Sequence, residues 1–307
     1  MQITQKQPVI VISGTNASGK SALGIRLAQK YNAEIISADS RQIYRGFDLC
    51  CGKVTAEERA LVPHHMLDVC SVGENYSVTD YQRAVYALIP EIAARGRLPM
   101  IVGGTGLYID AVTKGYDFAD ETIDADFRQY LEEQSIETLQ AMLSEDGREF
   151  FKDHPADWQN KRRLARAIEK ERSGNRLDAD NKPLFDVLQL GVTWPREMLH
   201  ERIDLRLATR IAEGMLDEVG DYLKNGGNAH YLHKLGLEYK YIAWYFEKKY
   251  DSIAEFSAEM SAAIKKFAKQ QVKWFRRDPA VRWIDMTADP FAEACAQIDT
   301  FLAAAVS

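Results

Sequence analysis

Residues 14–21 form a glycine-rich segment whose residue types and spacing could bind a diphosphate or a triphosphate. They match the pattern G-x-x-x-x-G-K-[ST] in full and read Gly14-Thr15-Asn16-Ala17-Ser18-Gly19-Lys20-Ser21. Glycine lets the backbone curve so that successive N–H groups point at phosphate oxygens, and the N-terminus of a following helix adds its dipole. Lys20 adds a positive charge, and the Ser21 hydroxyl can reach a bound Mg²⁺. The segment therefore predicts a phosphate-binding site that uses Mg²⁺.

The flanks of this segment predict the elements that must position it. The apolar run 8–13 is typical of a buried strand, and residues 22–28 have helical periodicity. Further strands are predicted over 33–38 and 98–102, with a helical stretch over 81–94 between them. Short apolar strands that alternate with helices predict a parallel sheet covered on both faces.

Polar residues follow the second and the third of these strands. Asp39 comes directly after the second strand, and Thr105 follows the third within a glycine-rich turn. Ligands of parallel sheets bind beyond the carboxyl ends of the strands. We therefore expect Asp39, Thr105 and the phosphate-binding loop to converge on one site.

The composition divides the chain into a P-loop α/β core, a helical insertion and a helical C-terminal part. Residues 1–115 form the first part of the core. From 116 to 186 the charge rises and helical patterns follow one another, which predicts a helical insertion with helices over 125–133, 136–143 and 160–172. A strand over 187–192 returns to the sheet, and the remainder of 187–307 is mainly helical.

The formal net charge of −6 hides two strongly basic segments. Residues 159–176 contain seven lysines and arginines against two glutamates, and residues 261–277 contain six and no acidic residue. An acidic protein that concentrates basic charge in this way offers local surfaces to a polyanion. A solvated helix face is the alternative for either segment taken alone.

Length, composition and cysteine spacing limit the class of protein. The 307 residues, with 46% apolar content, are typical of a globular enzyme. No apolar run approaches the roughly 20 residues of a membrane helix, and the first residues lack a signal-peptide core, so we expect a cytoplasmic protein without a membrane partner. The four cysteines favour reduced thiols. A zinc site of Cys50, Cys51, His64 and His65 fits no standard ligand spacing.

Further motifs decide among the enzymes that share this phosphate-binding loop. In chain order they are Ser37-Ala38-Asp39-Ser40-Arg41-Gln42-Ile43-Tyr44, Gly52-Lys53, Val102-Gly103-Gly104-Thr105-Gly106-Leu107-Tyr108, Ala268-Lys269-Gln270-Gln271 and Trp274-Phe275-Arg276. In this order and spacing the set resembles the tRNA dimethylallyltransferases, bacterial enzymes that prenylate adenosine 37 of tRNA. The resemblance runs through nearly the whole chain.

The resemblance implies a reaction and its catalytic residues. A dimethylallyl group would pass from dimethylallyl diphosphate to N6 of adenosine 37, in tRNAs that read codons beginning with U, and give N6-isopentenyladenosine. The exocyclic amine is a poor nucleophile, so we expect Asp39 to take its proton. The resemblance implies that Thr105 positions the amine and the departing oxygen. It also implies that Arg206 stabilises the diphosphate with Lys20 and with Mg²⁺ held through Ser21.

The resemblance also implies a tRNA partner, whose anticodon stem-loop the insertion and the C-terminal helices would clamp. The residues that match tRNA-contacting positions of the family are Asp39, Ser40, Arg41, Gln42, Thr105, Arg128, Arg162, Arg163, Leu164, Ala165, Arg166 and Lys269. The target base must leave its stack to enter the site. We expect the chain to act as a monomer.

Other roles remain open for two residues and for the whole chain. Asp39 could instead order Mg²⁺ or cap a helix, and Arg206 could form a surface ion pair with Asp204 or Glu201. Three other functions are compatible with the loop: a small-molecule P-loop kinase, a prenyltransferase acting on free adenine nucleotides, and a nucleic-acid-binding module without transferase chemistry. A small-molecule kinase would not need the two basic segments.

Overall fold

The computed structural model describes residues 6–118, 124–175, 177 and 181–306. The chain forms two compact units. Unit 1 comprises Met1–Thr113 and Leu184–Ser307, and unit 2 comprises Lys114–Pro183. No helix of the described ranges is both long and apolar enough to cross a membrane.

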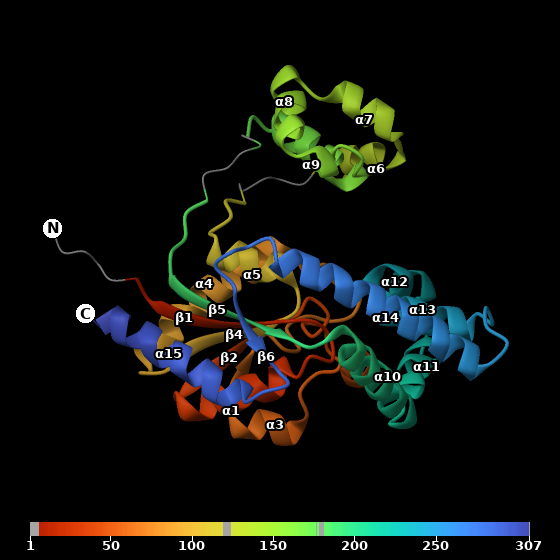
Figure 1. The fold of residues 1–307 in the computed structure, drawn as a ribbon. Coiled ribbons are helices and arrows are strands. Elements are labelled where there is room, and N and C mark those ends of the chain that lie inside the picture. The colour runs from red at the N-terminus through yellow and green to blue at the C-terminus, as the bar shows by residue number, and fades with distance from the viewer. Residues whose placement is uncertain (1–5, 119–123, 176, 178–180, 307) are drawn as a thin grey trace. The chain divides into compact units, whose positions relative to one another are not determined.

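Within its described residues, unit 1 contains a six-stranded parallel sheet (Figure 1). The strands lie in the order β3-β2-β4-β1-β5-β6, with bounds β1 Pro8–Ser13, β2 Ala33–Ala38, β3 His64–His65, β4 Leu98–Gly103, β5 Asp186–Thr193 and β6 Arg282–Asp285. In register, Ile10 of the central strand lies beside Met100 of β4 and Leu188 of β5. The α/β class and the four predicted strands are confirmed, whereas β3 and β6 were not predicted.

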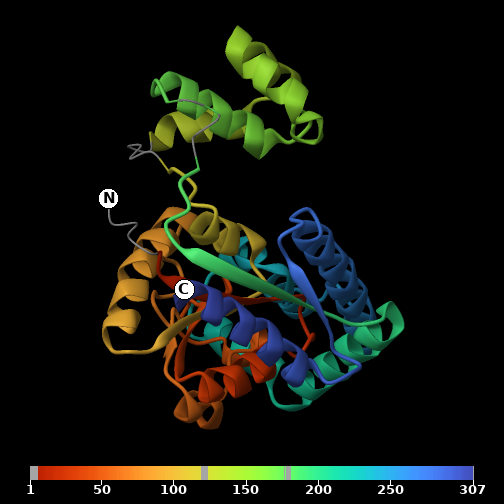
Figure 2. The same ribbon diagram turned by 60° about the vertical axis from the view of Figure 1, so that its left-hand side comes forward.

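Helices cover both faces of this sheet and one of its ends. They are α1 Lys20–Lys30, α2 Asp48–Cys51, α3 Ala56–Leu61, α4 Val78–Ala94, α5 Gly106–Thr113, α10 Arg196–Ala212, α11 Met215–Lys224, α12 Ala229–Leu235, α13 Leu237–Phe246, α14 Ile253–Phe275 and α15 Pro290–Val306. Figures 1 and 2 place α1 and α15 on one face, and α4 and α5 on the other. The helices α10 to α14 lie together at the end of the sheet (Figure 1).

Alternate side chains of β1 explain why both faces are apolar. Ile10 and Ile12 pack in one hydrophobic cluster with residues of α1 and α15. Val9 and Val11 pack in the cluster of the opposite face, with residues of α4 and α5. Successive side chains of a strand point to opposite faces, so a strand buried on both sides must be apolar throughout. A third cluster joins the helices α10 to α14 around Tyr239 and Phe256.

Unit 2 is a small helical body with its own hydrophobic cluster. Its helices are α6 Ala125–Glu133, α7 Ile136–Met142, α8 Glu145–Asp153 and α9 Lys161–Arg172, with a 3₁₀ turn at Pro155–Asp157. Short polar side chains begin each helix by accepting a backbone N–H bond, namely Asp124, Ser135, Ser144 and Asn160. Leu131, Leu139 and Leu164 are fully buried in the cluster. The three helices predicted in this segment are confirmed, and α8 was missed.

Candidate active site

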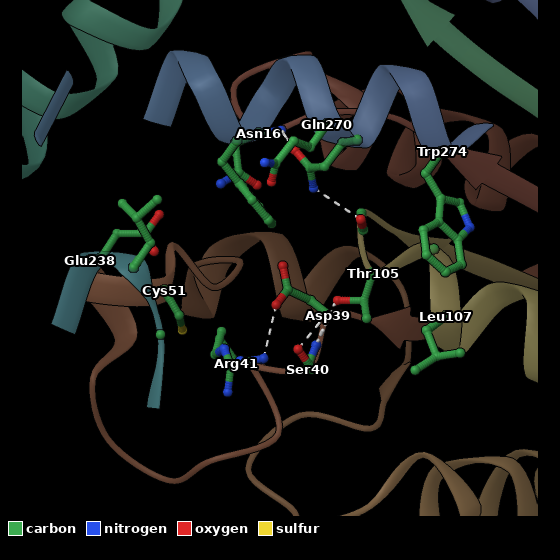
Figure 3. Close-up of a pocket in the computed structure, with 16 residues that line it drawn as sticks. Asn16, Asp39, Ser40, Arg41, Cys51, Thr105, Leu107, Glu238, Gln270 and Trp274 are labelled. Atoms are coloured by element: carbon green, nitrogen blue, oxygen red, sulfur yellow. Dashed lines mark hydrogen bonds between the residues drawn. The ribbon is translucent and has the colours of Figure 1, made fainter. Parts of the chain in front are cut away.

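Three loops meet beyond the carboxyl ends of the neighbouring strands β2, β4 and β1. The loop after β1 carries residues 14–19, β2 ends just before Asp39, and β4 leads into Thr105. The backbones of β2 and β4 approach closely, because a Cβ atom added to Gly103 would lie 2.2 Å from the carbonyl oxygen of Ala38. The strand order therefore places the three predicted groups side by side, as Figure 3 shows for Asn16, Asp39 and Thr105.

Lys20 begins α1 and lies buried under the phosphate-binding loop. Its Nζ donates to the carbonyl oxygen of Thr15 at 3.1 Å. Burial lowers the pKa of Lys20 to about 8, and the nearby Arg206 and Arg210 lower it further, whereas Asp39 raises it. An anion bound beside this ammonium would favour its charged form.

The Asp39 carboxylate is held by the backbone of its own turn. Its Oδ1 accepts the Arg41 N–H at 2.9 Å, while Oδ2 has no hydrogen bond to the described residues. The Thr105 hydroxyl accepts the Ser40 N–H at 3.0 Å and donates to the Ser40 hydroxyl at 3.4 Å. These bonds fix both side chains at the wall of one cavity of about 380 Å³ (Figure 3).

Gln271 of α14 joins two of the three loops, and its role was not predicted. Its buried amide donates from Nε2 to the carbonyl oxygen of Gly104 at 2.9 Å. Its Oε1 accepts the backbone N–H of Asn16 at 3.1 Å. One side chain thus ties the loop after β4 to the phosphate-binding loop.

Trp274 closes another side of the 380 Å³ cavity. Its indole N–H donates to Asp110 at 3.0 Å, and the Arg277 guanidinium lies 4.2 Å from the ring centroid. A Cβ atom at Gly106 would come within 2.3 Å of the indole. The glycine in this turn is therefore needed for the tryptophan to pack.

Two other ionisable groups line the same cavity. Burial raises the pKa of the Cys51 thiol to about 12, so this cysteine is protonated near neutral pH and unsuited to be a nucleophile. Burial also raises the pKa of Glu238, against the opposing effect of Arg210. Glu238 is a second carboxyl group beside Asp39, and the sequence motifs did not single it out.

A row of arginines on α10 faces the other side of the phosphate-binding loop. Arg202 donates from Nε to the carbonyl oxygen of Ala17 at 2.9 Å, and Arg206 donates to the carbonyl oxygen of Gly52 at 3.4 Å. Burial and the adjacent Arg210 lower the pKa of Arg206 to about 10. The three arginines, four residues apart, line a second cavity of about 460 Å³ that also contains Ser21. Sequence motifs indicated Arg206 and missed the other two.

Asp204 does not form the ion pair that was an alternative for Arg206. Its carboxylate accepts from Lys265 of α14 at 2.6 Å instead. Arg206 is half-buried at the second cavity, where its guanidinium can meet an anion.

The predicted metal role of Ser21 can be tested against its surroundings. The described residues contain no group of three or more His, Cys, Asp or Glu side chains that could hold a metal ion alone. Asp48, which lines the second cavity, is paired with Lys53 at 2.6 Å. Mg²⁺ commonly keeps several waters and binds through few protein oxygens plus substrate phosphates. A half-buried hydroxyl beside a diphosphate fits that habit.

The remaining predicted tRNA contacts of unit 1 differ in availability. Gln42 is engaged internally, accepting from the Ser37 hydroxyl at 2.9 Å and donating to the Gly52 carbonyl oxygen at 3.1 Å. Arg41 lines the 380 Å³ cavity, and Lys269 is exposed on α14.

In unit 2 the predicted contacts lie on α6 and α9. Arg128 forms two hydrogen bonds with Glu169, at 2.7 and 2.8 Å, and Arg166 contacts the same carboxylate at 3.2 Å. Arg162 and Arg163 are exposed, and Ala165 is half-buried. Leu164 is fully buried in the hydrophobic cluster, which leaves its side chain no surface for a ligand.

Comparisons with known proteins agree with this arrangement. The model of the family described as IPP transferase matches residues 42–278. A tRNA dimethylallyltransferase of Bacillus mycoides is 39% identical over 294 residues, covering 92% of this chain and 91% of the relative. A tRNA dimethylallyltransferase 2 of Shewanella sediminis is 37% identical and covers 94% and 96%.

Solved structures show the same relationship. The crystal structure of a tRNA isopentenylpyrophosphate transferase from Bacillus halodurans is similar with a TM-score of 0.72 and 32% identity, covering 98% of this chain and 97% of that chain. A eukaryotic dimethylallyltransferase acting on tRNA has a TM-score of 0.82 at 24% identity, covers 97% and 80%, and shows the shared fold. By its sequence and its structure, this chain belongs to the IPP transferase family.

Proposed function

We propose that this chain transfers the dimethylallyl group of dimethylallyl diphosphate to N6 of adenosine 37 in tRNA. The observation that carries the proposal is the meeting of a phosphate-binding loop with Asp39 and Thr105 at the wall of one cavity. The names of the curated relatives support tRNA prenylation as the reaction of the family. We further propose that the substrates are tRNAs that read codons beginning with U.

The base would enter the 380 Å³ cavity with its amine toward Asp39. As the bond from N6 to C1 of the donor forms, the bond from C1 to the diphosphate oxygen breaks, and the diphosphate leaves with the electron pair. The Asp39 carboxylate takes the proton of the amine, because its Oδ2 has no hydrogen bond to the described residues. Thr105, fixed by the Ser40 N–H, positions the amine and the departing oxygen.

The diphosphate would lie between the phosphate-binding loop and the arginines of α10. Lys20 and Arg206 stabilise the charge that the diphosphate gathers as it departs. Mg²⁺, which Ser21 would help to hold, supplies further neutralisation of that charge when it is bound. Arg202 fixes the loop through the carbonyl oxygen of Ala17.

Recognition of tRNA would use exposed cations as phosphate contacts. On α9, Arg162 and Arg163 are exposed, and on α14 Lys269 is exposed. Such contacts hold a nucleic acid through its backbone and position it without reading sequence. Trp274 offers an aromatic face at the cavity to a base that has left its stack.

Incubation with dimethylallyl diphosphate, Mg²⁺ and unmodified tRNA tests the proposal. We expect the mass of one isopentenyl group on one adenosine, located by nuclease digestion and mass spectrometry. A transcript with guanosine at position 37 is the matched control and should gain no mass.

Parallel reactions test the other functions. Prenylation of free AMP at a rate similar to that of tRNA would favour a nucleotide prenyltransferase. ATP-dependent phosphorylation of a small acceptor would favour a kinase, and tRNA binding without consumption of the donor would contradict transferase chemistry.

A further inference from the structure

A small third cavity lies in unit 1 between the phosphate-binding loop and the helices α10, α13 and α14. Its volume is about 20 Å³. Its apolar lining consists of buried side chains, namely Ala17, Ile203, Leu207, Met260 and Ile264. An apolar void among close-packed side chains suits a hydrocarbon group better than water, which needs polar partners.

This small cavity adjoins both larger cavities of the site. It shares Asn16 and Glu238 with the 380 Å³ cavity that contains Asp39. It shares Ala17, Arg206 and Arg210 with the 460 Å³ cavity that contains Ser21. The small cavity therefore opens beside the place where a base in one cavity and a diphosphate in the other would meet.

The geometry of displacement gives this position a meaning, which rests on the proposed function. In a direct displacement, the attacking nitrogen, the carbon C1 and the leaving oxygen lie roughly in line. The remaining substituent of C1, the branched tail of the allyl group, must then project sideways from that line. We propose that the small cavity receives this methyl-bearing tail and limits the donor to five carbons.

The size of the cavity sets the limit. A volume of about 20 Å³ holds roughly one water-sized sphere, which corresponds to a methyl group. A donor with a second isoprene unit carries five further carbons, and they would have to displace buried side chains of α14. Met260 is fully buried, and Ile264 is 6% exposed, so both act as the closed end of the cavity.

Replacing Met260 by alanine tests the inference. The assay compares kcat/KM for dimethylallyl diphosphate and geranyl diphosphate with the same unmodified tRNA, and product masses distinguish the two groups. We expect the ratio for geranyl over dimethylallyl diphosphate to rise by at least about tenfold in Met260→Ala, because one methylene in a pocket already changes selectivity by about tenfold or more.

Met215→Ala is the matched control. Met215 is as completely buried, belongs to the same hydrophobic cluster and lines none of the three cavities. It should leave the ratio within about threefold. An equal rise in both variants would show that a loosened core, and not this cavity, admits the longer donor, and would overturn the inference.

A milder variant keeps the test valid if Met260→Ala does not fold, as judged by circular dichroism. Ile264→Val removes one methyl group from the same cavity, and we expect it to raise the ratio by about three- to tenfold. An unchanged ratio in the folded variants would overturn the inference while leaving dimethylallyl transfer intact. A wild type that transfers both groups equally well also overturns it, and one that transfers neither contradicts the proposed function as well.

Discussion

The two larger cavities of the site differ in what surrounds them. The 460 Å³ cavity is lined by Arg202, Arg206 and Arg210 and lies next to the buried Lys20, and burial and mutual repulsion lower the pKa of Lys20 and Arg206. The 380 Å³ cavity is shaped by hydrogen bonds of Thr105 and by the neutral amide of Gln271. One region stores unfavourable cation–cation interactions that an anion relieves, whereas the other holds its groups in fixed positions.

Removing the basicity of Asp39 should have the largest effect on this comparison. Asp39→Asn keeps the shape and the bond to the Arg41 N–H, but it cannot take the proton of the amine. We expect the single-turnover rate to fall by about 10²–10⁴, with donor and tRNA affinity within a few-fold of wild type. A rate reduced by less than about threefold at saturating substrates would exclude Asp39 as the base.

Removing a charge from the cationic region should affect binding and chemistry together. Lys20→Ala is expected to weaken the binding of dimethylallyl diphosphate and to slow transfer by about 10²–10³, since the ammonium stabilises both the bound and the departing diphosphate. Lys30→Ala, at the exposed end of the same helix, is the control and should change neither quantity. Unchanged donor affinity in Lys20→Ala would refute this role.

The hydrogen-bonded region should be sensitive to replacement of Gln271. Gln271→Leu leaves the Gly104 carbonyl and the Asn16 N–H without their partner, and each buried unpaired group costs about 1–3 kcal/mol. We expect a lower free energy of unfolding in urea and a kcat reduced by about 10–100-fold, because small misplacements of catalytic groups slow reactions strongly. A destabilised variant with full kcat would show that the loops keep their geometry without Gln271.

The cationic region also predicts a pH dependence of donor binding. Lys20 is charged below its pKa of about 8 and neutral above it, and a bound diphosphate favours the charged form. The dissociation constant for dimethylallyl diphosphate should therefore rise as the pH increases above about 8, by at most about tenfold per pH unit. In Lys20→Ala this rise should disappear, and its persistence would assign the titration to another group.

Unit 2 should contribute to tRNA affinity without affecting the comparison of the two cavities. Neutralising Arg162, Arg163 and Arg166 together should weaken tRNA binding and flatten its log–log salt dependence by roughly 0.7–0.9 for each phosphate group that the variant no longer binds. Donor affinity should be unchanged, since none of the three arginines lines a cavity that contains the phosphate-binding loop. Identical slopes in titrations of wild type and variant would contradict the proposed role of these arginines in binding phosphate.

The parts of the fold that the sequence predicted are those with a local signal. The strands β1, β2, β4 and β5 are continuous apolar runs, and the loop after β1 has a full motif. The short strand β3, with two residues, and β6, with an exposed arginine and aspartate, lie at the two edges of the sheet. Their pairing depends on where the chain is brought by other elements, so local patterns did not reveal them.

The same distinction applies to the site. Asp39 and Thr105 could be placed from strand ends, because parallel strands meet at one edge. Gln271 gave a weaker signal, as a polar residue on an otherwise apolar helix face, and only the structure shows its two partners. Arg202 and Arg210 have helical spacing from Arg206, yet which face of α10 meets the phosphate-binding loop is a tertiary fact.

The close packing of Trp274 against Gly106 restricts how this chain can change. Any larger residue at position 106 must push the indole away and thereby break its hydrogen bond to Asp110. The two positions are far apart in the chain, yet a substitution at one is tolerable only together with a smaller side chain at the other. They therefore form one inherited unit, and a chimera that takes its C-terminal helices from a relative must take the turn after β4 from the same parent.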